Sequence, residues 1–124
     1  MSIHRVAILS PGDMGHAVGR ALGEAGLEII TCLQGRSDRT RTLAERANIR
    51  DVATMEDLVI EADLVLSILV PAEALNVATR IADALRTTGA GAAFADCNAT
   101  SPQTALAIDE VIVAAGGRSI DASI

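Results

Sequence analysis

The residues best suited to bind a charged ligand form a turn near the start of the chain. Residues 5–9 are an apolar run of strand length, and a segment with helical periodicity begins near Gly15. Gly12 would let the backbone come close to a pyrophosphate, and Gly15 would let the helix press against the strand. The free N–H groups of the helix start would face the anion. The full predicted turn is Ser10, Pro11, Gly12, Asp13, Met14 and Gly15, with Ser10 replacing the first glycine of the G-x-G-x-x-G frame.

The end of the next predicted strand offers a second anion site. Residues 27–33 have strand character, and no carboxylate closes this strand. An acidic residue there would bind the ribose hydroxyls of NAD, whereas the 2′-phosphate of NADP calls for arginine. Arg36 could bind that phosphate with two parallel hydrogen bonds, Ser37 could donate its hydroxyl, and Arg39 or Arg41 would add positive charge. We therefore expect NADP rather than NAD, although the arginines of a solvated loop would give the same pattern.

Strands and helices must alternate along the chain to position these residues. We expect strands at residues 5–9, 27–33, 49–53, 64–70, 92–95 and 118–124. Helices are expected at residues 15–25, 38–47, 55–62, 71–88 and 102–115. Such alternation predicts an α/β fold, a doubly wound parallel sheet of Rossmann-like type, with residues 1–124 as a single domain.

Side-chain spacing gives details of these helices. Thr54 with Asp57 resembles a capping box, Ser101 before Pro102 is a helix start, and Gly26 is placed to end a helix. Gly15, Gly19 and Gly23 share one side of their helix, which predicts close approach of backbone or cofactor, although small-residue packing alone would also account for them. The expected inward residues are Ala17, Val18, Ala21, Leu22 and Ala25, then Leu75, Ala78, Ala82 and Leu85, then Ala105, Ile108, Ile112 and Ala115.

Ligands of such sheets lie beyond the carboxyl ends of the strands, where three stretches of this chain meet. If residues 10–15 hold the pyrophosphate, then Leu69, Val70 and Pro71 should lie along the nicotinamide ribose. Residues 96–101 should then lie beside the nicotinamide ring. Asn98 has the amide donor and acceptor that could orient a carboxamide or a substrate hydroxyl, but it could equally bond to nearby backbone.

The composition excludes several kinds of function. The net charge is −6 and Phe94 is the one aromatic residue, whereas nucleic-acid binding calls for a basic face and stacking rings. Neither a secretory leader nor a run of about twenty apolar residues is present, so we expect no membrane contact and a soluble, cytoplasmic protein. His4 and His16 have no metal-ligand spacing, and Cys32 and Cys97 are expected to be buried free thiols.

Catalytic chemistry is restricted as well. The sequence contains neither lysine nor tyrosine, which excludes Schiff-base catalysis and a Tyr/Lys proton relay. Any acid or base must be His, Asp, Glu or Cys, or must lie outside this chain. Asp96 is expected to bond to backbone at a strand end, so no catalytic residue is assigned.

Five motifs in order resemble the β-hydroxyacid dehydrogenase family, which includes 3-hydroxyisobutyrate dehydrogenase and the cofactor domain of 6-phosphogluconate dehydrogenase. They are residues 8–15, Gly35-Arg36-Ser37, Val70-Pro71, residues 96–102 and residues 121–124. The resemblance implies NAD(P)-dependent oxidation of a small hydroxy acid, or reduction of the matching carbonyl compound. By position it implies a cofactor turn at residues 12–15, 2′-phosphate contacts from Arg36 and Ser37, nicotinamide contacts from Val70 and Pro71, and substrate or nicotinamide contacts from Asn98 and Ala99.

Departures from the family pattern limit these implications. Relatives commonly carry Ser-Thr or Gly-Asn where this chain has Asn98-Ala99, so the usual substrate class does not transfer. The general acid/base of the family is a lysine in the helix after the last strand, and its substrate-anchoring glycine loop follows the equivalent of Ile124. We therefore interpret the chain as the cofactor-binding half of such an enzyme, truncated before a helical domain through which relatives largely form homodimers.

Two alternatives stay open at this point. The chain could be a stand-alone nucleotide-sensing regulatory module, but such modules often carry an acidic residue where this chain has Arg36. It could also be a doubly wound domain that binds no dinucleotide, which Ser10 would favour.

Overall fold

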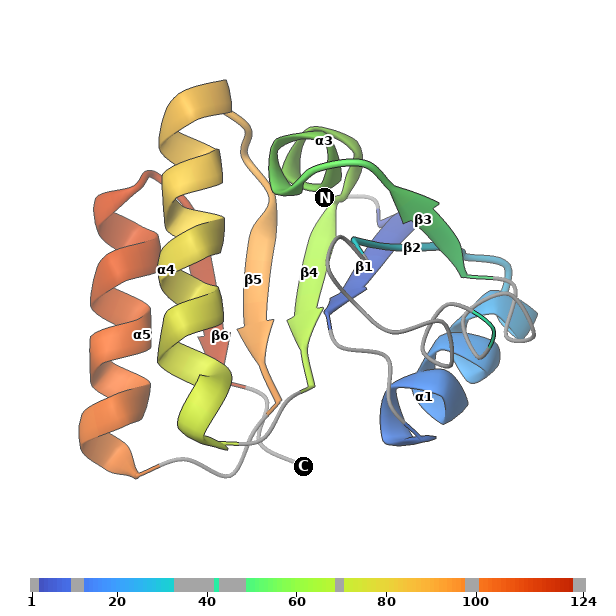
Figure 1. The fold of residues 1–124 in the computed structure, drawn as a ribbon, viewed down its shortest axis with the longest axis horizontal. Helices are drawn as coiled ribbons and strands as arrows, with labels where there is room; N and C mark the ends of the chain where they lie inside the picture. The colour runs from blue at the N-terminus through green and yellow to red at the C-terminus, as the bar shows by residue number, and fades with distance from the viewer. Residues whose placement is uncertain are drawn as a thin grey trace.

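A six-stranded parallel sheet organises the protein, and the computed structural model describes residues 3–9, 13–32, 42, 49–68, 71–97 and 101–121 of it (Figure 1). The strands are β1 (Arg5–Leu9), β2 (Glu28–Cys32), β3 (Arg50–Val52), β4 (Leu64–Ser67), β5 (Ala93–Asp96) and β6 (Arg118–Asp121). The helices are α1 (Asp13–Glu24), α3 (Met55–Glu61), α4 (Pro71–Thr88) and α5 (Pro102–Ala114). The predicted doubly wound α/β fold is confirmed. The helix expected at residues 38–47 lies outside the described residues except for Thr42, which is helical.

The strand order is β3-β2-β1-β4-β5-β6, so the chain reverses its direction of winding between β1 and β4. The register is set by pairs such as Val6 with Leu64 and Leu9 with Ser67. On its other side β1 pairs with β2, where Val6 lies opposite Ile29. In open α/β sheets this reversal point, at the carboxyl ends of the strands, is where ligands bind.

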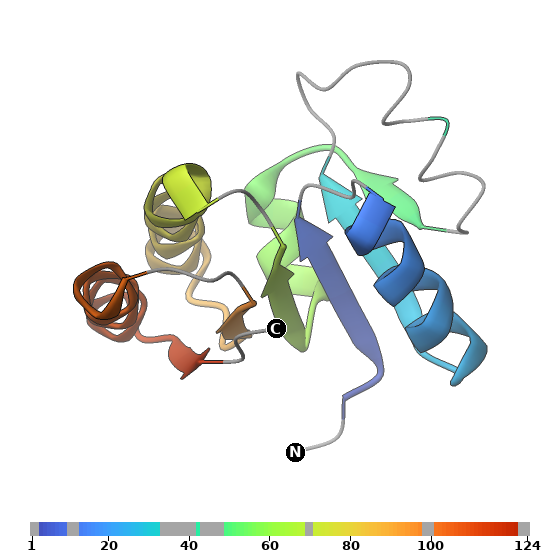
Figure 2. The same cartoon turned by 90° about the horizontal axis from the view of Figure 1, so that it is seen from below.

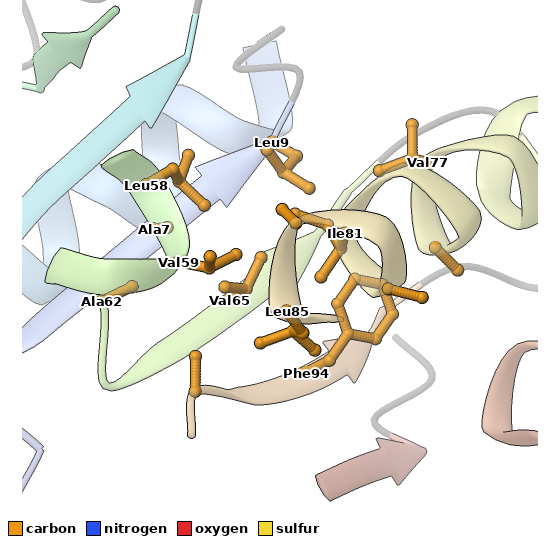
Figure 3. Close-up of a cluster of buried hydrophobic side chains, with 14 of the residues drawn as sticks. Ala7, Leu9, Leu58, Val59, Ala62, Val65, Val77, Ile81, Leu85 and Phe94 are labelled. Carbon is orange, nitrogen blue, oxygen red and sulfur yellow. The ribbon is translucent and has the colours of Figure 1, made fainter. Parts of the chain in front are cut away.

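Helices cover both faces of the sheet, as Figure 2 shows in a view turned from that of Figure 1. Helix α1 lies on one face, against β1 and β2, whereas α3, α4 and α5 lie on the other face. Because β1 has helices on both sides, its residues are apolar and are buried from Val6 to Leu9. The larger core cluster forms under α3, α4 and α5, where Val65, Ile81, Leu85 and Phe94 pack together (Figure 3).

Three predicted helix termini are confirmed. The hydroxyl of Thr54 accepts a hydrogen bond from the backbone N–H of Asp57 at 3.1 Å, which caps α3. Ser101 caps α5 in the same way, with Pro102 as the first helical residue. Gly26 follows α1 with a φ of 95°, a left-handed conformation that glycine adopts without a steric penalty.

Some predicted side-chain positions are wrong. Leu75 was expected to face inward, but it is 38% exposed. Ala74 is buried in its place, since one residue further along a helix is turned about 100° around the axis. The other predicted inward residues of α4 are buried, namely Ala78, Ala82 and Leu85. In α1 the predicted stripe is too wide, because Ala17 and Ala21 are exposed while other side chains of the helix, Val18 and Leu22, pack on the sheet.

Gly19 explains why α1 lies close to the sheet. A Cβ atom at this position would be 2.8 Å from Cδ1 of Ile49 and 3.2 Å from Cδ1 of Ile8. The space that the glycine leaves is therefore filled by side chains of the core. At Gly23, further along the same helix, a Cβ atom would meet Ile29 at an ordinary 4.0 Å.

Candidate functional site

The carboxyl edge of the sheet brings together the starts of two helices. Strand β1 ends at Leu9 and α1 begins at Asp13, while β4 ends at Ser67 and α4 begins at Pro71. Since β1 and β4 are neighbours in the sheet, the two helix N-termini flank the reversal point from opposite faces. Each N-terminus carries free backbone N–H groups and the positive end of the helix dipole, which favour an anion.

The strand ends at this edge are level with one another. Leu9 pairs with Ser67, and Ser67 pairs in turn with Asp96, so β1, β4 and β5 end in one row. The connections that follow them start side by side, although they are far apart in the sequence. The three stretches that the sequence analysis assigned to the ligand follow these three strand ends along the chain.

Four of the predicted site residues fall within the described part of the chain. Asp13, Met14 and Gly15 form the first turn of α1, and Pro71 is the first residue of α4. The others lie outside the described residues: Ser10, Pro11, Gly12, Arg36, Ser37, Arg41, Leu69, Val70, Asn98 and Ala99.

Two polar side chains are buried in the row of strand ends. Ser67 is fully buried and Asp96 is 5% exposed, and each of them takes part in an interaction within the protein. Burial of Asp96 fits the expected structural role at a strand end better than a role as a base open to substrate. Its backbone partner remains a prediction.

Cys97 follows Asp96 and completes this edge. Its backbone N–H donates to the carbonyl of Ser67 at 3.0 Å, which ties the start of the β5–α5 connection to β4. Partial burial, together with the carboxylate of Asp96, raises the pKa of the Cys97 thiol above its usual value. The thiol therefore stays protonated near neutral pH and is a poor nucleophile. The expectation of free thiols is confirmed, but only Cys32 is fully buried, since Cys97 is half-buried.

Thr31 is a feature of this region that the sequence analysis missed. It is fully buried one residue before the end of β2, and its hydroxyl has no hydrogen-bond partner in the part of the chain that the structure describes. Buried hydroxyls are usually bonded, because an unpaired one is costly. The sequence analysis did not single out Thr31, because threonine is a common strand residue and this one stands in a β-branched apolar run.

The structure also bears on two other classes of site. Among the described residues, no three His, Cys, Asp or Glu side chains are grouped so that they could hold a metal ion. Searching the same residues for a helix long and apolar enough to cross a membrane finds none.

Comparison with known proteins identifies the family of this chain. Residues 5–124 match the family model described as the NAD binding domain of 6-phosphogluconate dehydrogenase. An uncharacterized 28.5 kDa protein of Methanothermus fervidus is 26% identical over 100 residues, which are 81% of this chain and 38% of that protein.

Solved structures share the fold. A conserved protein of unknown function, described as similar to 3-hydroxyacid dehydrogenases, superposes with a TM-score of 0.81 at 26% identity, over 94% of this chain and 42% of that one. The 3-hydroxyisobutyrate dehydrogenase of Mycobacterium tuberculosis superposes with a TM-score of 0.77 at 18% identity, over 97% of this chain and 40% of its own. The chain thus spans about 40% of the length of these relatives.

Proposed function

Because the chain belongs to the family of the NAD binding domain of 6-phosphogluconate dehydrogenase, we propose that it binds a dinucleotide at the carboxyl edge of its sheet and prefers NADP to NAD. The observation that carries the preference is in the residues that follow β2. No carboxylate closes this strand, and Arg36, Ser37 and Arg41 come soon after it. A guanidinium that meets a 2′-phosphate through two parallel hydrogen bonds has no such partner on NAD.

In this proposal, different segments of the chain bind the two ends of the cofactor. The backbone N–H groups of Ser10, Gly12 and the first turn of α1 bind the pyrophosphate, and Pro11, which has no N–H, stiffens the turn. Val70 and Pro71, with Leu69 before them, lie along the nicotinamide half, because β4 neighbours β1 and ends level with it. Asn98 and Ala99 follow β5 on the far side of β4, where substrate would meet the nicotinamide ring.

The reaction class we propose is hydride transfer between NADP and a small hydroxy acid or its carbonyl form. The nicotinamide accepts or supplies the hydride, and this chain positions it. Proton transfer needs an acid/base. Among the described residues of the carboxyl edge, Asp96 is buried and the thiol of Cys97 has a raised pKa, so we assign this role to neither of them. Absence of an acid/base typically costs about 100- to 10,000-fold in rate, so this domain alone should bind the cofactor and turn over slowly.

Isothermal titration with NADPH and NADH tests the cofactor preference. We expect tighter binding of NADPH, and we expect Arg36→Ala to remove most of that difference by weakening NADPH roughly tenfold or more while leaving NADH unchanged. Arg80→Ala is the matched control, because Arg80 is an exposed residue of α4 and should leave both affinities unchanged. Equal affinity of the unmodified protein for the two nucleotides would refute the preference, and absence of binding to either would refute the proposed function.

A further inference from the structure

Ile49 connects the start of β3 to the middle of α1. It directly precedes Arg50, the first residue of β3, and only 4% of its surface is exposed. If Gly19 of α1 carried a Cβ atom, that atom would be 2.8 Å from Cδ1 and 3.3 Å from Cγ1 of Ile49. The end of the isoleucine side chain therefore occupies the space that a side chain at Gly19 would need.

Ile49 has little room to move. It belongs to a cluster between α1 and the sheet that includes Val6 and Ile8 of β1 and Ile29 of β2. These three side chains are buried as well, with at most 3% of their surface exposed. Protein interiors are close-packed, so a methyl group that is displaced here presses on its neighbours. Ile8 adds to this constraint, since its Cδ1 atom would be 3.2 Å from the same Cβ atom at Gly19. The position of Ile49 and the distance of α1 from the sheet are therefore linked.

The distance of α1 from the sheet determines where the N-terminus of the helix lies. Helix α1 begins at Asp13, six residues before Gly19 and thus about 9 Å along the axis. Backbone hydrogen bonds join these turns of the helix, so movement at Gly19 also moves the first turn. The backbone N–H groups of that turn are among those that bind the pyrophosphate in the proposed function.

We propose that Ile49 is a positioning residue for the nucleotide, a role that rests on the proposed function and deepens it. Its side chain, packed against Gly19, holds the first turn of α1 at the distance from the sheet at which the N–H groups meet the pyrophosphate. Binding groups must be held within about 0.5 Å of the productive geometry. A Cβ atom at Gly19 would be 2.8 Å from Ile49, whereas ordinary contacts begin at 3.4 Å, so α1 or Ile49 would have to move by about 0.6 Å.

A methyl swap between the two residues tests this role. Gly19→Ala adds a methyl group to α1, and Ile49→Val removes Cδ1, the atom nearest to it. Titration calorimetry of the folded variants should show that each single change weakens NADPH and NADH, Gly19→Ala about tenfold and Ile49→Val about threefold. The loss is the same for both nucleotides, because they carry the same pyrophosphate. In the double variant most of the affinity should return, since the added methyl group takes the place of the removed one.

Two matched controls separate positioning from general packing. Gly23→Ala makes the same substitution in α1, but its Cβ atom would be at an ordinary 4.0 Å from Ile29, so both affinities should change less than about twofold. Ile108→Val removes the same methyl group from a residue of α5 that is 1% exposed and lies in the other core cluster. It lowers stability on the face of the sheet opposite α1 and should leave both affinities unchanged.

The controls also define the results that would overturn the proposal. If the double variant is as weak as Gly19→Ala, or if Gly23→Ala or Ile108→Val weakens the nucleotides as much, affinity follows general packing and Ile49 has no positioning role. If Gly19→Ala does not fold, Ile49→Val and Ile108→Val still remove the same atom, and only the first should weaken the nucleotides.

A measurement without nucleotide gives a second check. The backbone NMR signals of Asp13 and Met14 report the first turn of α1. They should shift in Gly19→Ala, stay in place in Gly23→Ala and return in the double variant of Gly19→Ala with Ile49→Val. Unchanged signals in Gly19→Ala would overturn the proposal, because the added methyl group would then be accommodated without movement of α1.

The test is separate from that of the cofactor preference. Arg36→Ala should weaken NADPH alone, whereas the single variants at Gly19 and Ile49 should weaken both nucleotides by the same factor. If the unmodified protein binds neither nucleotide, the proposed function fails and the positioning role fails with it. If it binds them and the double variant restores nothing, only the positioning role fails.

Discussion

The carboxylate of Glu28 on β2 lies 2.8 Å from Nε of Arg5 on β1 and joins two strands at the edge where they begin. The other oxygen of Glu28 accepts from Arg50 of β3 at 3.0 Å, and Arg50 reaches Glu61 at the end of α3 at 2.7 Å. These side chains are about one third to one half exposed, so water weakens each pair. Their effect is to connect three strands and a helix at the edge opposite the proposed nucleotide site.

Because of this ion-pair network, the free energy of unfolding depends on pH in the acid range. The hydrogen bond from Arg5, and then that from Arg50, lowers the pKa of Glu28 below its ordinary value of 4.5, and Arg50 lowers that of Glu61. A carboxyl group with a lowered pKa binds fewer protons in the folded than in the unfolded state, so its contribution is present above pH 4.5 and is lost as the pH falls below that value. Asp63 acts in the same sense below its ordinary value of 3.8.

We predict that the urea midpoint is nearly constant from pH 7 to pH 5 and falls progressively below pH 4.5. Glu28→Gln should lower the midpoint at pH 7 and make the fall below pH 4.5 shallower, because one of the titrating groups is removed. Asp109→Asn, on the exposed surface of α5, is the control. A pH profile for Glu28→Gln parallel to that of the unmodified protein would show that the network does not contribute.

The two glycines of α1 should respond differently to alanine. Gly23→Ala should raise the free energy of unfolding by about 0.5–1 kcal/mol, because alanine favours the helix and its Cβ would make only an ordinary contact. Gly19→Ala should gain less or lose stability, since its Cβ must displace the end of Ile49 and press on Ile8. Urea unfolding of the two variants at pH 7 measures the difference. An equal gain at both positions would mean that Ile49 and Ile8 accommodate the added Cβ atom without loss of stability.

Phe94 should be among the most important single side chains for stability. It is 1% exposed and packs under α4, so Phe94→Ala should cost about 3–5 kcal/mol, a large part of the stability of a domain of this size. Leu106→Ala on the outer side of α5 is the comparison, because Leu106 is 59% exposed and should cost well below 1 kcal/mol. Thermal unfolding, monitored by circular dichroism, measures the loss of stability in each variant. A loss at Leu106 similar to that at Phe94 would indicate that the outer side of α5 is covered in solution.

The sequence predicted local structure well, because short-range chemistry determines it. The caps at Thr54 and Ser101 and the left-handed Gly26 depend on neighbouring residues, and each was found where expected. The inward position of Leu75 was wrong because it depends on where α4 rests on the sheet, which helical spacing alone leaves open by about one residue.

Sites made by distant segments were harder to predict. The turn before α1 and the start of α4 were predicted at the carboxyl edge, since the rule for parallel sheets needs only the order of elements. The cavity at the amino edge of the sheet, where the strands begin, was not predicted. Its lining residues Ile60, Gly91 and Arg118 belong to three separate units of the chain and meet only through the strand order and register.

Leu9, Ser67 and Asp96 end their strands level with one another, so the three connections that follow start from three separate points. Each connection departs from its own strand, and the backbone hydrogen bonds of the sheet fix all the departure points. Insertions or substitutions beyond Cys97 in the connection after β5 would therefore leave the strand ends from which the connections after β1 and β4 depart unchanged. Under the proposed function, the residues after β5 can therefore change which substrate is accepted while the nucleotide contacts after β1 and β4 are retained.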